Sequence, residues 1–227
     1  MVRRLPFGEE MKRRVAEAVA AAEVGTSGEI VVVVHRRAGR YGDTLAVLSV
    51  IGASVLYLLG MGGPALLGSS TPQWTASTDR LPSPIWGLLV WTVGFVGVWF
   101  LFESAPSLLR PFVSRERRAK EAEGAAWRAF GERGVRRTQG GTGVLLFVGE
   151  FEKTVAVLGD RAIDAELEPA DWKRVRDLVL AGYGRGRPAE GLLAGIAEAG
   201  ALLARHFPAS PDEEPGIGNE PHLTDGS

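Results

Sequence analysis

Two uninterrupted apolar runs decide the fold of this chain: TLAVLSVIGASVLYLLGMG at residues 44–62 and IWGLLVWTVGFVGVWFLF at residues 85–102. From the first run up to residue 109 the chain holds only three formally charged side chains, whereas charged residues crowd both flanks. Each run approaches the roughly 20 apolar residues that cross a ~30 Å hydrocarbon layer as a helix. The sequence therefore predicts a transmembrane hairpin, with helices at about 44–62 and 85–103.

The composition of the two runs favours lipid over a protein interior as their surroundings. A pair of buried core helices is the alternative, but such helices usually carry a polar stripe, and these runs have none. Trp86 and Trp99 lie near opposite ends of the second run, as amphipathic rings do at lipid–water boundaries. We expect Gly63-Pro64 to end the first helix. Small residues, which let membrane helices approach closely, recur at roughly helical spacing: Ser49, Gly52, Gly60 and Gly63, then Gly94 and Gly97.

Basic residues predict the orientation of the hairpin. They gather before the first run and after the second: Arg36, Arg37 and Arg40, then Arg110, Arg115, Arg117, Arg118 and Lys120. The connector between the runs offers only Arg80, beside Asp79. Because Lys and Arg concentrate in cytoplasmic loops, we expect a multi-pass protein of the bacterial inner membrane with both termini cytoplasmic. Glu103, at the end of its run, is expected to be an interfacial carboxylate rather than a proton-relay residue.

Composition narrows the function classes. The 227 residues include 26 Lys and Arg against 27 Asp and Glu, so the charge gives no indication of a nucleic-acid partner. The absence of cysteine excludes disulfides, thiolate metal sites and cysteine nucleophiles. The first residues are basic but are followed by Glu9, Glu10 and Lys12, so we expect no signal peptide. The first membrane helix is then expected to act as the insertion signal.

The rest of the chain alternates helix and strand patterns on both sides of the hairpin. The β-branched run EIVVVVH at residues 29–35 is typical of a strand buried on both faces. Two further strands are predicted at 142–148 and 154–158, joined by a short hairpin loop. Periodic apolar residues predict helices at 9–23, 114–133, 160–166, 169–181 and 188–206.

This order predicts an α/β fold: a small mixed β-sheet with helices on both faces, interrupted by the transmembrane hairpin. A helix separates the first two strands, so we expect them to be parallel, and the second and third strands to be antiparallel neighbours. Residues 1–40 and 111–208 are expected to form the two parts of one domain, with the hairpin at 41–110. Residues 209–227, rich in Pro, Asp, Glu and Gly, are expected to be a disordered tail.

Three stretches, in this order, resemble the TPM domain family: TSGEIVVV at 26–33, then GVLLFV at 143–148 with KTVAV at 153–157, and finally YGRG at 183–186 with GLLAGI at 191–196. The resemblance covers residues 5–208 apart from the hairpin, and is to a membrane-embedded branch in which a hairpin interrupts the domain after its first strand. It implies an α/β/α sandwich. Acid phosphatase activity, divalent-metal binding and roles in the assembly or repair of membrane complexes have been attributed to members of the family.

Few residues are candidates for a metal or phosphatase site. Many TPM domains carry an acidic cluster just before the second strand, but the corresponding segment here, RRTQGGT at 136–142, has no carboxylate, and a hard cation needs charged oxygen ligands. Asp160 and Asp164, at i and i+4 after the third strand, and Glu29 at the start of the first strand remain as weak candidates. The simpler interpretation makes Asp160 a helix N-cap, Asp164 a solvated partner of Arg161, and Glu29 a polar strand end.

The same segment is a candidate anion site. Two guanidinium groups and two hydroxyl groups lie beside backbone amides there, and such a loop can bind a phosphate: Arg136, Arg137, Thr138 and Thr142. A plain glycine turn that feeds a strand is the alternative. The sequence contains no P-loop, dinucleotide fingerprint, nucleophile elbow or zinc-helix motif.

We therefore expect a non-catalytic binding or assembly module at the cytoplasmic membrane. Its partners would be the lipid bilayer and a membrane or cytoplasmic protein, and it would require no cofactor. The alternative is a divalent-metal-dependent phosphomonoester hydrolase, similar to an acid phosphatase, that uses Asp160, Asp164 or Glu29. The missing acidic loop favours binding over hydrolysis. A transporter subunit is poorly supported, because two short helices without buried charge line no polar path.

Overall fold

The computed structural model describes residues 8–66, 84–133, 135, 140–209 and 222–224. The chain divides into two compact units. Residues 41–114 form one unit, which holds the apolar hairpin, and the segments on both sides of it together form the other, an α/β unit.

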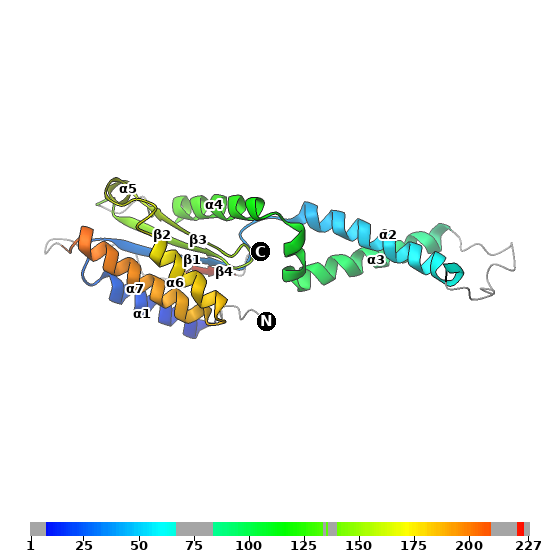
Figure 1. Cartoon of the computed structure of the whole chain (residues 1–227), viewed down its shortest axis with the longest axis horizontal. Helices are drawn as coiled ribbons and strands as arrows, with labels where there is room; N and C mark the ends of the chain where they lie inside the picture. Colours follow the sequence, from blue (N-terminus) through cyan, green and yellow to red (C-terminus); the bar gives the residue numbers. More distant parts are fainter. Residues whose placement is uncertain (1–7, 67–83, 134, 136–139, 210–221, 225–227) are drawn as a thin grey trace. The chain divides into compact units, whose positions relative to one another are not determined.

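The α/β unit confirms the predicted fold class, a mixed α/β fold with a small mixed sheet (Figure 1). Several elements have the bounds that the sequence predicts, and others differ by one or two residues. The elements are α1 (Glu9–Glu23), β1 (Glu29–His35), α4 (Arg115–Glu132), β2 (Gly143–Gly149), β3 (Thr154–Gly159), α5 (Arg161–Glu166), α6 (Lys173–Gly184), α7 (Pro188–His206) and β4 (His222–Thr224).

The helix predicted at 169–181 is the clearest error in element bounds, because α6 begins and ends later. The start is delayed by a turn, in which the Glu168 N–H donates to Asp171 Oδ2 at 2.8 Å. The end is delayed because Gly182, one residue beyond the predicted end of the helix, packs inside the contact between α6 and α7. A Cβ at Gly182 would lie 2.5 Å from Gly191 Cα, so the two backbones touch there.

Among the described residues the strand order of the sheet is β3-β2-β1-β4. β1 runs parallel to β2, from the pair Glu29 and Gly143 to the pair His35 and Gly149, and β2 runs antiparallel to β3, as the sequence predicts. β4 pairs in parallel with the end of β1. The expectation that 209–227 is disordered throughout is therefore wrong for β4, because so short a strand in a polar segment shows no alternating pattern.

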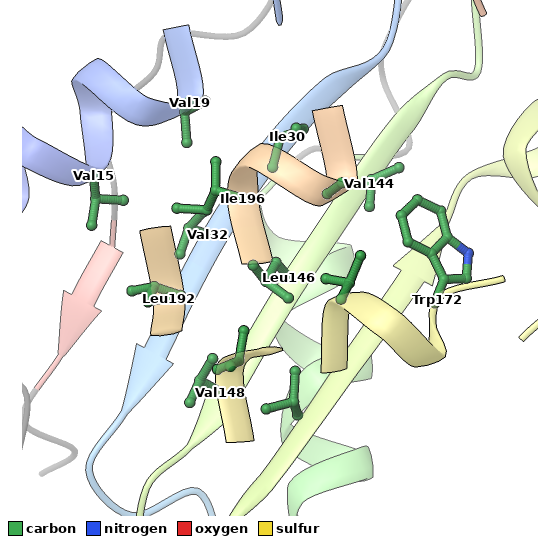
Figure 2. Close-up of a cluster of buried hydrophobic side chains, with 14 of the residues drawn as sticks. Val15, Val19, Ile30, Val32, Val144, Leu146, Val148, Trp172, Leu192 and Ile196 are labelled. Atoms are coloured by element: carbon green, nitrogen blue, oxygen red, sulfur yellow. The ribbon is translucent and has the colours of Figure 1, made fainter. Parts of the chain in front are cut away.

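Alternate residues of the strands face two separate cores, since successive side chains of a strand point to opposite faces. The core beneath α1, α6 and α7, part of which Figure 2 shows, takes these strand residues: Ile30, Val32, Val34, Val144, Leu146, Val148 and Val155. The core on the other face, beneath α4, takes Val33, Leu145 and Phe147. β2 is consequently buried along its whole length. The unbroken apolar runs in the sequence follow from this double coverage.

The second unit contains both predicted membrane helices, α2 (Gly42–Leu66) and α3 (Pro84–Ser104), followed by the 3-10 helix η1 (Pro106–Phe112). Both α-helices are long and apolar enough to cross a membrane. The mean hydropathy is 1.8 over Gly42–Leu59 and 1.6 over Gly87–Ser104. α2 continues through Gly63-Pro64, so the prediction that this pair ends the helix is wrong. Pro64 falls in the final turn, where its missing N–H costs a single intrahelical hydrogen bond.

The contact between α2 and α3 uses some of the small residues that the sequence singled out. A Cβ at Gly52 would lie 3.1 Å from Val98 Cγ1, and one at Gly94 would lie 3.6 Å from Ala53 Cα. Small residues at these positions therefore let the helices approach closely. A Cβ at Gly97 would meet no heavy atom within 4 Å, so the prediction that Gly97 lies in this contact is wrong.

Candidate functional site

The amino end of the sheet gathers the residues that the sequence singled out. β1 and β2 begin side by side, with Glu29 paired to Gly143, and the antiparallel β3 ends beside them. Glu29, Thr142 and Asp160 therefore lie at neighbouring strand ends. The other members of the predicted anion site lie outside the described residues: Arg136, Arg137 and Thr138.

Thr142 joins the starts of β1 and β2. Its buried side chain donates through Oγ1 to the Ser27 carbonyl oxygen at 2.8 Å. Its own carbonyl oxygen accepts from the Glu29 N–H at 3.2 Å. The hydroxyl group is thus used inside the fold, which favours the interpretation of this segment as a turn that feeds a strand.

Asp160 caps the short helix α5. Its Oδ1 accepts from the Arg161 N–H at 2.8 Å, and its backbone has the extended conformation of an N-cap residue (φ −81°, ψ 178°). Its N–H donates to the Gly143 carbonyl oxygen at 2.8 Å, and its carbonyl oxygen accepts from the Asp164 N–H at 2.9 Å. These contacts match the N-cap alternative and fasten α5 to the start of β2.

Asp164 lies one helical turn beyond Asp160 and close to the end of β3. A Cβ at Gly159 would lie 2.4 Å from Ile163 Cγ2 and 2.8 Å from Asp164 Oδ1, so only glycine fits there without a rearrangement. Partial burial raises the pKa of Asp164, and the negative charge of Asp160 raises it further. The negative charge of Asp160 thus disfavours the ionisation of Asp164, an effect that a bound cation would relieve.

A divalent cation at this end of the sheet would take oxygen ligands from Asp160 and Asp164 and complete its shell with water. Calcium takes about six to eight oxygen ligands, and magnesium keeps several waters. Within the described parts of the chain, no group of three or more His, Asp or Glu residues is placed to hold a metal ion.

Glu23, which the sequence analysis did not identify as a candidate, binds the backbone near the start of β1. Its Oε1 accepts from the Ile30 N–H at 2.7 Å. The following turn is tied to the end of α7, because Thr26 Oγ1 donates to the Phe207 carbonyl oxygen at 2.5 Å. Glu29, the predicted candidate in this region, begins β1 and pairs through its backbone. An acidic residue at the end of a helix that precedes a strand was the available signal for Glu23.

The carboxyl end of the sheet carries a polar contact that the sequence did not predict. Glu152, only 4% exposed, lies in the turn between β2 and β3. Its Oε1 accepts from the N–H groups of Ala38 and Gly39, at 3.1 Å in each case. A Cβ at Gly149 would lie 2.9 Å from Glu152 Oε2, so glycine leaves the space that the carboxylate needs. Glu152 thereby fixes the segment that leaves β1 toward the hairpin.

Tyr183 adds a second polar contact at this end. Its hydroxyl group donates to Glu150 Oε1 at 3.0 Å and so joins the end of α6 to the β2–β3 turn. Burial raises the pKa of Tyr183 far above its ordinary value, and the negative charge of Glu150 raises it further. The phenol therefore stays a neutral donor at every physiological pH.

His35 ends β1 and packs edge-on against Phe147, with 5.2 Å between the ring centroids. Burial lowers the pKa of His35, the positive charges of Arg133 and Arg128 lower it further, and Glu132 opposes them. The imidazole is therefore neutral at pH 7. It lies at the carboxyl ends of two parallel strands, where sheets of this kind commonly bind ligands.

The described contacts of Thr142, Glu152 and Asp160 all serve the backbone. Thr142 and Glu152 each join segments that lie more than a hundred residues apart in the chain. Asp160 caps a helix. Through these contacts, the three side chains stabilise the loops at the two ends of the sheet.

Replacing Glu152 with Ala is expected to lower the free energy of unfolding by about 2–3 kcal/mol. The buried N–H of Gly39 and the partly buried N–H of Ala38 would both lose a charged acceptor. Glu152→Gln is the matched control: it keeps an acceptor oxygen of the same reach, and should lose about 1 kcal/mol or less. Urea unfolding of the full chain in detergent, followed by circular dichroism, measures both. An Ala variant as stable as the natural chain would show that Glu152 does not hold this segment.

Comparison with known proteins supports the fold alone. No family model and no curated protein matches the chain. Among solved structures, the chain is similar to the NMR structure of the BA42 protein from the psychrophilic bacterium Bizionia argentinensis. The TM-score is 0.55 at 18% sequence identity, and the match covers 99% of this chain and 100% of that chain. The two proteins therefore share a fold, and the likeness carries no information about activity.

Proposed function

We propose that this chain is a membrane-anchored, non-catalytic binding or assembly module. Its α/β unit works at the cytoplasmic face of the bacterial inner membrane, and the hairpin of α2 and α3 anchors it in the bilayer. The partner would be a membrane or cytoplasmic protein. No cofactor is required for such a role.

One observation carries the proposal: the large apolar side chains of the hairpin point outward. Only 17% of the segment Gly42–Leu59 in α2 is buried, and none of the segment Gly87–Ser104 in α3. A core helix of a soluble protein would bury most of it. The outward residues, between 44% and 72% exposed, include Val50, Ile51, Leu58, Leu88, Val93 and Phe100. Soluble monomers rarely expose a contiguous apolar surface of this extent, whereas a bilayer accommodates it without cost.

The orientation of the anchor rests on the flanking arginines. Lys and Arg concentrate in cytoplasmic loops, so the basic residues at 36–40 and 110–120 support a topology with both termini in the cytoplasm. The α/β unit, assembled from the two flanking segments, then lies on the cytoplasmic side.

We further propose that the α/β unit has the α/β/α sandwich of TPM domains. The order of the resembling stretches supports this, and so do the positions of the helices. α1, α6 and α7 share a core with one face of the sheet, and α4 shares a core with the other. A TPM-like scaffold would suit either a binding module or a hydrolase, so the choice between these depends on the carboxylates.

The contacts of Asp160 and Thr142 support binding over hydrolysis. Asp160 is engaged as a helix cap, and Thr142 is engaged with the turn before β1. The rival function, a phosphomonoester hydrolase, would recruit Asp160, Asp164 and Glu29 around a divalent cation at the amino end of the sheet. That chemistry would require Asp160 to bind a metal while its Oδ1 accepts from the Arg161 N–H.

A phosphatase assay separates the two functions. We expect the purified chain, supplied with p-nitrophenyl phosphate and Mg²⁺, Mn²⁺ or Ca²⁺, to turn over no faster than the double variant Asp160→Asn and Asp164→Asn. Asparagine caps helices about as well as aspartate, so the variant should stay folded while losing its carboxylates. Metal-dependent turnover that disappears in the double variant would establish the hydrolase instead.

A further inference from the structure

One edge of β1 faces away from β2. The Glu29 N–H donates toward β2, to the Thr142 carbonyl oxygen, and alternate residues of a strand direct their backbone groups to opposite edges. Ile30, Val32 and Val34 therefore direct their N–H and C=O groups to the other side, where β4 lies. We refer to the backbone groups of these three residues as the β1 edge.

The two ends of the β1 edge are closed in different ways. At one end the Ile30 N–H donates to Glu23 Oε1 at 2.7 Å, so a side chain takes the place of a neighbouring strand. At the other end the neighbour is β4, whose described residues pair with β1 from Val33 to His35. A strand edge is a ready template for another chain. Among the described residues, the neighbouring strand along the β1 edge is β4, which is three residues long.

β4 is suited to leave this position. A three-residue strand contributes few ladder hydrogen bonds to hold it against β1. Farther back, the Ala209 N–H donates to the Gly25 carbonyl oxygen at 3.2 Å. The segment therefore stays tethered to the α/β unit after it separates, and competes as an intramolecular ligand.

We propose that the β1 edge is a strand-addition site, at which an extended segment of a partner protein pairs in parallel with β1 once β4 has left. A segment of about six residues without proline would pair along Ile30, Val32 and Val34 together and displace the Glu23 contact as well. Its main chain supplies the affinity. This inference rests on the proposed binding function for the existence of a partner, and it makes β4 an intramolecular inhibitor of that binding.

The test measures binding of a fluorescent peptide to the full-length chain in lipid nanodiscs. The peptide has the sequence of residues 219–225 with the change Pro221→Thr. The register directs the Thr224 N–H toward β1 and the Leu223 N–H away from it. Thr224→Pro in the chain therefore removes a ladder donor and releases β4. Leu223→Pro is the matched control, because proline is tolerated where the N–H faces away from the ladder.

We expect the Thr224→Pro chain to bind the peptide about tenfold more tightly than the natural chain, in which tethered β4 competes. The Leu223→Pro chain should match the natural one. Equal affinities for all three chains, or binding to none, would overturn the proposal. In the unmodified chain, excess peptide should slow hydrogen exchange at the Val32 amide, and an unchanged rate there would also contradict it. Phosphatase turnover would refute the proposed function without altering these affinities, so the two failures can be told apart.

Discussion

A chain in which a Gly/Ser linker of about ten residues replaces residues 42–111 is expected to be soluble and folded, because the entropy of closing a loop grows only logarithmically with its length. The natural chain should remain with the membrane fraction. Among the described residues, both buried clusters of the α/β unit consist of residues outside 41–114. The hairpin therefore contributes apolar surface that faces outward, and its removal should leave these two cores intact.

Fractionation and circular dichroism check this result. The excised chain should stay in the supernatant after ultracentrifugation, show a mixed α/β spectrum and unfold cooperatively on heating. The full-length chain, processed in parallel, should sediment until detergent is added. Aggregation of the excised chain, or a spectrum without a thermal transition, would mean that the hairpin is needed to complete the α/β unit.

Replacing Gly182 with Ala is expected to destabilise the α/β unit by about 3 kcal/mol, the upper part of the usual range for overpacking. The new Cβ would lie 2.5 Å from Gly191 Cα and 2.9 Å from the Arg187 carbonyl oxygen. These are backbone atoms, so α6 and α7 must separate to admit the methyl group. The contact is reciprocal, since a Cβ at Gly191 would lie 2.7 Å from Gly182 Cα, and Gly191→Ala should cause a similar loss.

Gly184→Ala is the matched control, because it lies at the end of the same helix and a Cβ there would meet nothing within 4 Å. Alanine is also the better helix former, so this variant should be as stable as the natural chain or up to about 1 kcal/mol more stable. Thermal unfolding of the full chain in detergent should place Gly182→Ala roughly 6–12 °C below the natural chain. Coincident melting of the two glycine variants would show that the close approach of the helices tolerates a side chain.

Local patterns in the sequence were sufficient for most elements of the fold. The β-branched run at 29–35 and the two apolar runs were decisive. Burial on both faces leaves a strand no polar position, and the two long runs are apolar on every side. The strand pairing was also predicted, parallel for β1 and β2 and antiparallel for β2 and β3. That pairing brings the start of β1, the start of β2 and the end of β3 to one end of the sheet. The simpler interpretation of Asp160 was a helix N-cap, and the structure shows that it caps α5.

Contacts between segments that are distant in the chain could not be predicted from the sequence. Glu152 and Ala38 lie 114 residues apart, on opposite sides of the hairpin, and no periodicity relates them. Predicting the close approach of Gly182 to Gly191 requires the crossing geometry of α6 and α7. The local sequence around Gly182, which is rich in glycine, does not contain that information. β4 is too short to show strand periodicity. Gly97 illustrates the reverse error, because helical spacing alone does not fix which face of a helix meets its partner.

The most direct test of the membrane anchor uses single cysteines, which the natural chain lacks entirely. Cysteines placed at Ser70 or Ser77, in the connector, should react with a membrane-impermeant thiol reagent added to intact cells. Cysteines at Arg118 or Ser210 should react only after the membrane is opened. This pattern is the one that a hairpin with both termini in the cytoplasm predicts. Equal labelling at all four positions before the membrane is opened, or the reverse pattern, would contradict the account.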